Sequence, residues 1–351
     1  MESGTIEQTL PGLDADVPRV AMTPGHAIPL TPQKRLMVFS GRSHPELAAK
    51  IAERLGVELG EVELTTFANG ETYCRYDESI RGADVFILQT GCEPVDRNLM
   101  ELFFMIQGAK LASAKRITAV MPLFPYARQD RKAKPREPIS ARLVADILQL
   151  AGADRVLTMD LHAGQIQGFF TIPVDHMTAL PLFARHFRDL GLTGSGVVSV
   201  SPDAGRARLA VRFAEMIDAD FAIMHKTRPA HDEVAVTEIA GRVRDKVAIV
   251  GDDVIMTGGT LLANVAALKE HGVNDVWVFA THGLFCNGAL SRFADSDITG
   301  ILVTDTVPID PRERPDNLTV LTVSGLLAET MMNVFADDSV SAIFGGENQL
   351  F

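Results

Sequence analysis

Short, mainly apolar runs alternate with longer stretches along most of the chain, starting at Arg35. Each run has the four or five residues of a buried strand, and several of the stretches between them repeat apolar positions at helical spacing. We predict strands at residues 37–40, 85–89, 117–121, 156–159, 197–200, 221–224, 247–250, 276–280 and 301–304. We predict helices at residues 45–55, 98–114, 139–150, 206–217 and 260–271. This alternation predicts an α/β fold, in which mainly parallel sheets are covered by helices.

An internal repeat predicts two related domains. Residues 151–163 align with residues 271–283 without a gap, and each segment runs from a helix end through a turn and a strand to a histidine. We therefore expect tandem α/β domains at residues 35–180 and 181–351. Residues 1–34 contain several prolines and glycines without a sustained period, and we expect them to form a mobile extension.

Composition limits the class of protein. The 351 residues are 46% hydrophobic and 22% charged, which is typical of a soluble globular protein. No apolar run approaches the roughly 20 residues needed to cross a membrane. The net charge of −12 argues against nucleic-acid binding, because proteins that bind nucleic acid usually present a basic surface. Three widely spaced cysteines, and a segment 1–10 without Lys or Arg, predict reduced thiols and a cytoplasmic location.

An acidic pair, Asp252 and Asp253, follows the predicted strand at residues 247–250, and residues 257–260 read Thr-Gly-Gly-Thr before the next predicted helix. Ligands of open α/β sheets bind at the carboxyl ends of strands. The glycines allow backbone N–H groups to form an anion nest at the helix N-terminus, which favours a phosphate monoester. The carboxylates can accept hydrogen bonds from sugar hydroxyls or hold a metal ion. We therefore favour a site for a ribose 5-phosphate group over a plain Gly-Gly turn.

A basic segment at residues 128–136 carries five cations within nine residues of an otherwise acidic chain. Such charge runs are commonly solvated loops. This one follows the predicted strand at residues 117–121, so we interpret it as a phosphate-binding segment. Within residues 125–138 it occupies the place that the acidic loop has in the second repeat. The first domain is therefore expected to bind a more highly charged ligand.

His162 and Asp203 each have a structural and a functional interpretation, and Asp160 is the acidic neighbour of His162. His162 lies two residues beyond Asp160 at the end of a predicted strand, where an imidazole can cap carbonyl groups or contact a polyphosphate-bound divalent ion, partly through water. Asp203 precedes a predicted helix and is either an N-terminal cap or a metal contact.

Two other polar segments are ambiguous alone. Asn69 and Glu71 flank a glycine, which indicates either a hairpin turn or, with Phe67 covering a base, part of a nucleotide site. Lys226 and Arg228 follow another predicted strand and begin a polar stretch that could close over a transferring phosphoryl group. Cations aimed at developing negative charge stabilise a transition state.

Together these segments resemble ribose-phosphate pyrophosphokinases, also called phosphoribosyl pyrophosphate synthetases. The resemblance extends from Arg35 to Phe351 through residues 67–71, 98–101, 126–130 and 160–175. The last segment is the most specific, because Asp-Leu-His, Gln-Ile-Gln-Gly-Phe-Phe and Pro-Val-Asp occur in it in that order. The resemblance implies two tandem phosphoribosyltransferase-like domains, with ATP on the N-terminal side and ribose 5-phosphate on the C-terminal side.

The resemblance also implies a reaction, the transfer of the β,γ-diphosphoryl group of ATP to the 1-hydroxyl of ribose 5-phosphate with release of AMP. It implies Mg²⁺ as cofactor and a homo-oligomer, commonly a hexamer, with nucleotide sites near subunit contacts. The implied ATP-binding residues are Phe67, Asn69, Glu71, Arg128, Gln129 and Asp130. The implied metal ligands are His162 and Asp203, and the implied catalytic cations are Lys226 and Arg228. The implied ribose 5-phosphate residues are Arg228, Asp252, Asp253, Met256, Thr257, Gly258, Gly259 and Thr260.

The chain departs from the family pattern at Met256, where many members have an acid. An additional carboxylate near the sugar is therefore missing. Two other functions stay open: a phosphoribosyltransferase, which would need the acidic loop without a second nucleotide site, and a non-catalytic regulatory homologue. The presence of His162, Lys226 and Arg228 argues against the regulatory homologue.

Overall fold

The computed structural model describes residues 34–227 and 236–341. The expected N-terminal extension lies outside the described residues apart from Lys34, and Arg228 also lies outside them. In the described part of the chain, every helix is too short or too polar to traverse a lipid bilayer.

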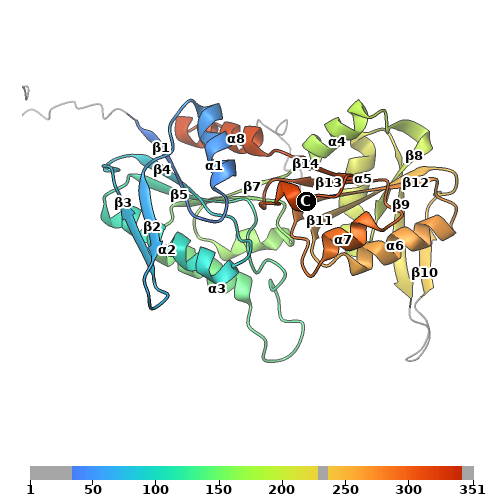
Figure 1. Ribbon diagram of the computed structural model, residues 1–351, viewed down its shortest axis with the longest axis horizontal. Coiled ribbons are helices and arrows are strands. Elements are labelled where there is room, and N and C mark those ends of the chain that lie inside the picture. The colour runs from blue at the N-terminus through green and yellow to red at the C-terminus, as the bar shows by residue number, and fades with distance from the viewer. Residues whose placement is uncertain (1–33, 228–235, 342–351) are drawn as a thin grey trace, which may run out of the picture. The chain divides into compact units, whose positions relative to one another are not determined.

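The first half of the chain forms a five-stranded parallel sheet in the order β1-β4-β5-β6-β7 (Figure 1). Its strands are β1 (Leu36–Ser40), β4 (Asp84–Leu88), β5 (Arg116–Met121), β6 (Arg155–Met159) and β7 (Val174–Met177). Its helices are α1 (Pro45–Leu55), α2 (Val95–Leu111) and α3 (Ser140–Ala151). Strand residues alternate between faces, so Val38 packs in the cluster that contains α1, whereas Phe39 packs in the cluster that contains α2 and α3.

A hairpin of β2 (Val62–Thr66) and β3 (Thr72–Tyr76) packs against α2. The Tyr76 hydroxyl donates to the Met105 carbonyl at 2.8 Å, and its ring lies edge-on to Phe39 with centroids 4.8 Å apart. The connecting residues include Gly70 at φ +91°, a backbone conformation that favours glycine. The hairpin interpretation of Asn69 and Gly70 is therefore confirmed.

The second half forms a seven-stranded sheet in the order β10-β9-β8-β11-β12-β13-β14, in which β10 is the antiparallel edge strand. The strands are β8 (Val197–Ser201), β9 (Asp220–Thr227), β10 (Val236–Ala240), β11 (Val247–Ile255), β12 (Asp275–Gly283), β13 (Gly300–Thr304) and β14 (Leu318–Leu321). The helices are α4 (Leu180–Asp189), α5 (Ala207–Met216), α6 (Gly259–Glu270), α7 (Ala289–Ala294) and α8 (Ser324–Ala336). Short 3₁₀ turns include η1 (Gly164–Phe169) and η3 (Ala204–Arg206).

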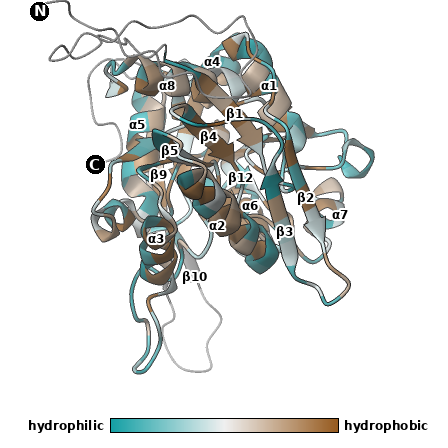
Figure 2. Ribbon diagram, turned by 90° about the vertical axis from the view of Figure 1, so that its left-hand side faces the viewer, coloured by the Kyte–Doolittle hydropathy of each residue, from teal (hydrophilic) through white to brown (hydrophobic). Residues whose placement is uncertain are grey.

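One apolar cluster joins the two sheets. Phe183 of α4 contacts Phe279 of β12 with ring centroids 4.8 Å apart, in the same buried cluster as Val38 and Phe86 of the first sheet. Helix α8 belongs to this cluster and packs on α1, although it comes from the end of the chain. Figure 2 shows the apolar strands β1 and β4 between α1 and α2. The division of the chain at residue 180 stays a prediction.

The predicted α/β fold with mainly parallel sheets is confirmed, and all nine strands and five helices are present. The ends lie within three residues of prediction with one exception, because β11 continues to Ile255. Asp252 and Asp253 therefore lie inside a strand rather than beyond it. The elements that the hydrophobic pattern did not indicate are β2, β3, β7, β10, β14, α4, α7 and α8.

The internal repeat corresponds to equivalent structure. Strands β6 and β12 begin at aligned positions, Arg155 and Asp275, and each follows a helix and a turn. The residue before each strand donates its backbone N–H to a carbonyl near the start of the neighbouring strand. Asp154 donates to Ile117 of β5, and Asn274 donates to Lys246 just before β11, both at 2.9 Å. The loops that follow β5 and β11 are therefore equivalent, as the sequence repeat predicts.

The carboxyl ends of β6 and β12 are tied by polar side chains. Asp160, which follows β6, accepts hydrogen bonds through Oδ2 from the Thr281 hydroxyl at 2.6 Å and from the Ala179 backbone N–H at 2.8 Å. The buried His282 side chain reaches the Met159 carbonyl through Nε2 at 3.1 Å. Asp160 therefore has a structural role, because its carboxylate joins elements of both halves.

We predict that Asp160→Ala destabilises the protein by about 2 kcal/mol, since it leaves two part-buried donors without an acceptor. Asp160→Asn retains an oxygen acceptor and tolerates the φ of +35° found here, so it should lose less than half as much stability. Urea unfolding monitored by circular dichroism measures both changes. Equal losses in the two variants would contradict this role.

Candidate active site

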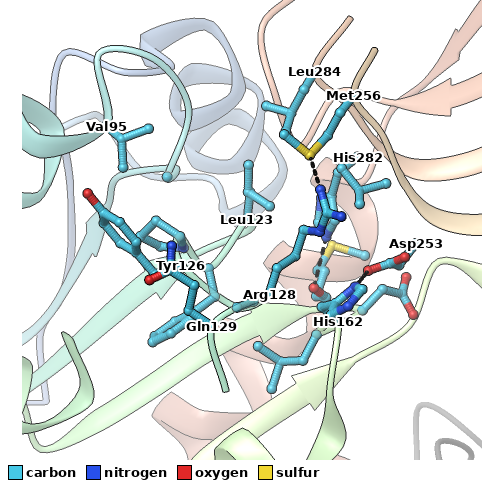
Figure 3. A pocket seen from close by; sticks show the side chains of 18 residues that line it. Val95, Leu123, Tyr126, Arg128, Gln129, His162, Asp253, Met256, His282 and Leu284 are labelled. Atoms are coloured by element: carbon cyan, nitrogen blue, oxygen red, sulfur yellow. Dashed lines mark hydrogen bonds and ion pairs between the residues drawn. The ribbon is translucent and has the colours of Figure 1, made fainter. Parts of the chain in front are cut away.

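A cavity of about 530 Å³ lies where the carboxyl ends of the two sheets meet (Figure 3). Its wall from the first half includes Tyr126, Arg128 and Gln129, which follow β5, and its wall from the second half includes Asp253 and Met256. Figure 3 shows Arg128 extending between the two walls towards Met256. The basic segment and the acidic loop therefore face the same space.

A second cavity of about 260 Å³ adjoins the first. It is lined by Asp203, Arg206, Asp252 and residues 256–261. The two cavities share five lining residues, Arg128, His162, Asp253, Val254 and Met256. One ligand in each cavity would therefore lie against a common wall.

The acidic pair reaches a cavity wall because β11 extends beyond its neighbour β8. Strand β11 pairs with β8 only from Val247 to Val250, whereas its pairing with β12 continues to Ile255. Residues 251–255 consequently have a paired strand on one side only. Although Asp252 and Asp253 lie inside the strand, they border an open cavity.

Arg206 connects the acidic pair to His162. The Arg206 Nε lies 3.2 Å from Asp252 Oδ1, and its Nη2 donates to Asp253 Oδ1. The same Nη2 lies 2.8 Å from His162 Nδ1, which is also 2.8 Å from Asp253 Oδ2. Four charged or ionisable side chains thus form one cluster that contains residues of both halves.

The two acids have opposite pKa shifts. Burial raises the pKa of Asp252, and the neighbouring Asp253 carboxylate raises it further. Burial also favours a higher pKa for Asp253, but hydrogen bonding to His162 and Asp252 and the charge of Arg206 outweigh it and hold the pKa of Asp253 below its ordinary value. Asp253 is therefore the permanent anion of the pair.

Gly258 fixes the shape of the loop between β11 and α6. Its φ of +74° is in the left-handed region, and a Cβ at this position would lie 2.2 Å from the Phe293 ring. Gly258 is the N-terminal cap of α6 and has no side chain that could accept from the first N–H groups of the helix. These residues line the second cavity. Unpaired N–H groups at a helix N-terminus bind anions.

Residues of the basic segment make specific contacts. Arg128 Nη1 donates to Met256 Sδ at 2.8 Å, which joins the two halves across the shared wall. The Gln129 side chain accepts a hydrogen bond from the Ser140 hydroxyl at the start of α3. Asp130 accepts from Gln165 at 2.6 Å. Asp130 therefore has a structural partner on η1, and it does not line the first cavity.

Donors suited to magnesium lie in the second cavity. Its wall includes side chains whose nitrogen and oxygen atoms can ligate divalent ions, namely those of His162, Asp203, Asp252 and Asp253. Among the described residues, however, no three acidic, histidine or cysteine side chains are close enough to hold a metal by themselves. Asp203 also accepts from the Arg206 backbone N–H at 3.1 Å, which confirms its capping interpretation. These residues fit a Mg²⁺ ion that keeps several water ligands.

The hairpin residues lie apart from this arrangement. Phe67 is 51% exposed and packs edge-on against Tyr73, while Asn69 Oδ1 accepts from the Glu71 backbone N–H at 3.2 Å. Residues 67–71 line neither of the two cavities. If residues 67–71 bind ATP, they therefore do so at a place other than these two cavities.

Lys226 lies near the end of β9, where its backbone pairs with Thr237 of β10. Sequence reasoning overlooked Arg206, which was considered only as the start of a helix. Its signal was its position three residues after Asp203, in a turn that follows a buried strand end.

Two family models match the chain. Residues 36–152 match the N-terminal domain of ribose phosphate pyrophosphokinase, and residues 218–345 match a phosphoribosyl synthetase-associated domain. The ribose-phosphate pyrophosphokinase of Caldanaerobacter subterraneus subsp. tengcongensis is 47% identical over 309 residues, which cover 88% of this chain and 98% of that protein. The Mycobacterium tuberculosis protein of the same name is 46% identical over 318 residues, which cover 90% and 97% respectively.

A solved structure shares the fold. The crystal structure of phosphoribosylpyrophosphate synthetase from Mycobacterium smegmatis superposes with a TM-score of 0.81 at 45% identity, covering 86% of this chain and 99% of that one. The chain therefore belongs to the ribose-phosphate pyrophosphokinase family and is an enzyme of that class.

Proposed function

We propose that the chain transfers the β,γ-diphosphoryl group of ATP to O1 of ribose 5-phosphate, releasing AMP and 5-phosphoribosyl 1-diphosphate. The observation that carries this proposal is the wall shared by the two cavities. The second cavity presents acids and an anion nest, which suit a sugar phosphate. The first cavity adds Tyr126 and Gln129 to the shared Arg128, whose charge suits a triphosphate. A sugar oxygen and the middle phosphorus of a nucleotide bound there would be neighbours.

The 5-phosphate would accept hydrogen bonds from the N–H groups of residues 257–260, and Asp252 would accept hydrogen bonds from ribose hydroxyls. Arg128 and Gln129 would hold the polyphosphate of ATP. The O1–Pβ bond forms as the bond from Pβ to the AMP oxygen breaks, in line and without a covalent enzyme intermediate. Positioning and charge neutralisation therefore account for the acceleration.

Lys226 and Arg228 are proposed as the cations that neutralise the transferring group. Lys226 lies on β9, in the same sheet as the acidic strand β11. Magnesium would be held by His162 and Asp203, in part through water. When bound, it supplies charge neutralisation at the phosphate oxygens.

We also propose a homo-oligomer, a hexamer by family resemblance. An apolar surface on neighbouring helices supports it. The exposed side chains of Met100, Phe104 and Leu111 recur on one side of α2, and Leu143 and Leu150 do so on α3. A neighbouring copy would offer its hairpin residues, Phe67, Asn69 and Glu71, to a nucleotide site. A cytoplasmic location is proposed too, supported by the free thiols of Cys74, Cys92 and Cys286.

A coupled AMP-release assay tests the reaction. We expect AMP formation to require ATP, ribose 5-phosphate and Mg²⁺ together. A phosphoribosyltransferase would release no AMP from this mixture, and a regulatory homologue would be inactive as a purified chain. Either result would overturn the proposal.

We predict that Gly258→Ala raises the KM for ribose 5-phosphate about 10- to 100-fold, because displacement of the nest by the Phe293 ring misplaces the phosphate. Gly196→Ala is the matched control, since a Cβ there has no atom within 4 Å and Gly196 lines neither cavity. It should leave the KM within about twofold of the parent, as a surface change without contacts does. Steady-state kinetics at saturating ATP measure both, and equal KM values in the two variants would exclude a nest at this loop.

Met256→Asp should alter the dependence of activity on ribose 5-phosphate or Mg²⁺. The new carboxylate would lie where Arg128 now meets Met256 Sδ and would form an ion pair with it on the shared wall. Met256→Leu, which removes the sulfur without adding charge, is the control. Substrate and magnesium titrations that coincide with those of the parent would remove this role from the position.

A further inference from the structure

Arg206 occupies the middle of the acidic site. Its side chain is only 19% exposed, and its guanidinium contacts the carboxylates of Asp252 and Asp253. Its Nη1 also lies 3.4 Å from the His162 backbone carbonyl, so the group is held from several sides. A planar guanidinium with fixed donors is well suited to bridge two carboxylates. The charge that a divalent ion would neutralise at this pair is thus already balanced in part by the protein.

The contacts of His162 are mutually exclusive. Its Nδ1 lies 2.8 Å from Asp253 Oδ2 and 2.8 Å from Arg206 Nη2. A protonated Nδ1 donates to the carboxylate, whereas an unprotonated Nδ1 accepts from the guanidinium. One nitrogen cannot do both, so the cluster has two arrangements. In the first, His162 pairs with Asp253, and in the second it pairs with Arg206.

The two arrangements differ in their capacity to bind metal. A neutral histidine that donates its Nδ1–H to a carboxylate has a free lone pair on Nε2, which is the usual state of a metal-ligating histidine. A neutral histidine that accepts at Nδ1 carries its proton on Nε2 and offers no lone pair there. His162 Nε2 makes no hydrogen bond to any residue within the described ranges, so this nitrogen is available in the first arrangement.

We infer that Arg206 is a resident cation that competes with a divalent metal for Asp252, Asp253 and His162. While Arg206 is in place, it neutralises the acids and holds His162 in the tautomer that cannot ligate. Binding of a divalent ion would release the Nε2 proton of His162 to solvent. Once Arg206 has withdrawn, Nδ1 would take up a proton from solvent and donate it to Asp253. Arg206 is therefore a positioning residue that sets the metal requirement of the site. The inference rests on the proposed function only for the identity of the metal.

Isothermal titration of the full chain with Mn²⁺, without substrates, tests the competition. Arg206→Ala should bind Mn²⁺ about tenfold more tightly than the parent, because a competing charge a few ångströms away is removed. Arg208→Ala is the matched control: it removes the same charge two residues later, from a side chain without a hydrogen bond to the described residues. Its affinity should stay within about twofold of the parent, as expected for a solvent-exposed, screened charge. An equal gain in both variants, no gain in Arg206→Ala, or weaker binding would overturn the inference.

A second measurement does not depend on the Arg206 variant. Nitrogen chemical shifts of ¹⁵N-histidine in the parent chain, assigned with His162→Gln, should show Nδ1 unprotonated without metal and protonated after Mg²⁺ is added. A His162 tautomer that does not change on saturation would overturn the inference even if Arg206→Ala failed to fold. Because neither measurement uses ATP or ribose 5-phosphate, an inactive enzyme would refute the proposed reaction without affecting this result.

Discussion

The contact between the carboxyl ends of the two parallel sheets determines the rest of this structure. Asp160, which follows β6, accepts hydrogen bonds from Thr281 of β12 and from the backbone N–H of Ala179, just before α4. The buried His282 of β12 reaches across to the end of β6. The carboxyl end of a parallel sheet is where open α/β folds place their ligands. Since two such ends meet here, their two ligand sites become a single pair of adjoining cavities.

The chemistry of the site follows from uneven strand lengths and from charge. Because β11 extends past β8, two adjacent acids lie in a regular strand and still border a cavity. Two close carboxylates repel each other, so the pKa of Asp252 is raised while Asp253 stays ionised. Arg206 supplies a fixed cation beside this pair in a chain whose net charge is −12. The local balance at the site, rather than the overall charge, therefore decides which ligands it accepts.

The sequence was sufficient for the layout of the fold but not for its contacts. Buried strands such as β5 and β8 are continuous apolar runs, so their positions could be predicted, and the repeat of residues 151–163 correctly paired β6 with β12. Strand β3 has half-exposed polar residues and helix α7 has only six residues, which leaves little periodicity to detect.

The candidate site shows the same limit. Loops that follow predicted strands placed Arg128 and Asp252 correctly near a cavity, because strand direction alone fixes which end they occupy. Arg206 could not be assigned in this way, since its role depends on partners 44 and 47 residues distant in the chain, His162 and Asp253. The exposed position of the hairpin tip depends on packing of β3 against α2, which no local pattern specifies.

The shared core also limits how the site can respond to ligands. Phe183, Phe213 and Phe279 belong to one buried cluster that includes strands of both sheets, and such close-packed interiors do not deform gradually. Movement of one sheet against the other would disrupt that cluster together with the polar ties at Asp160 and His282. Adaptation is therefore expected in side chains on the cavity wall. Arg128 now contacts Met256, a partner that phosphate oxygens would replace. Arg206 now contacts the acids, where a metal ion would take its place.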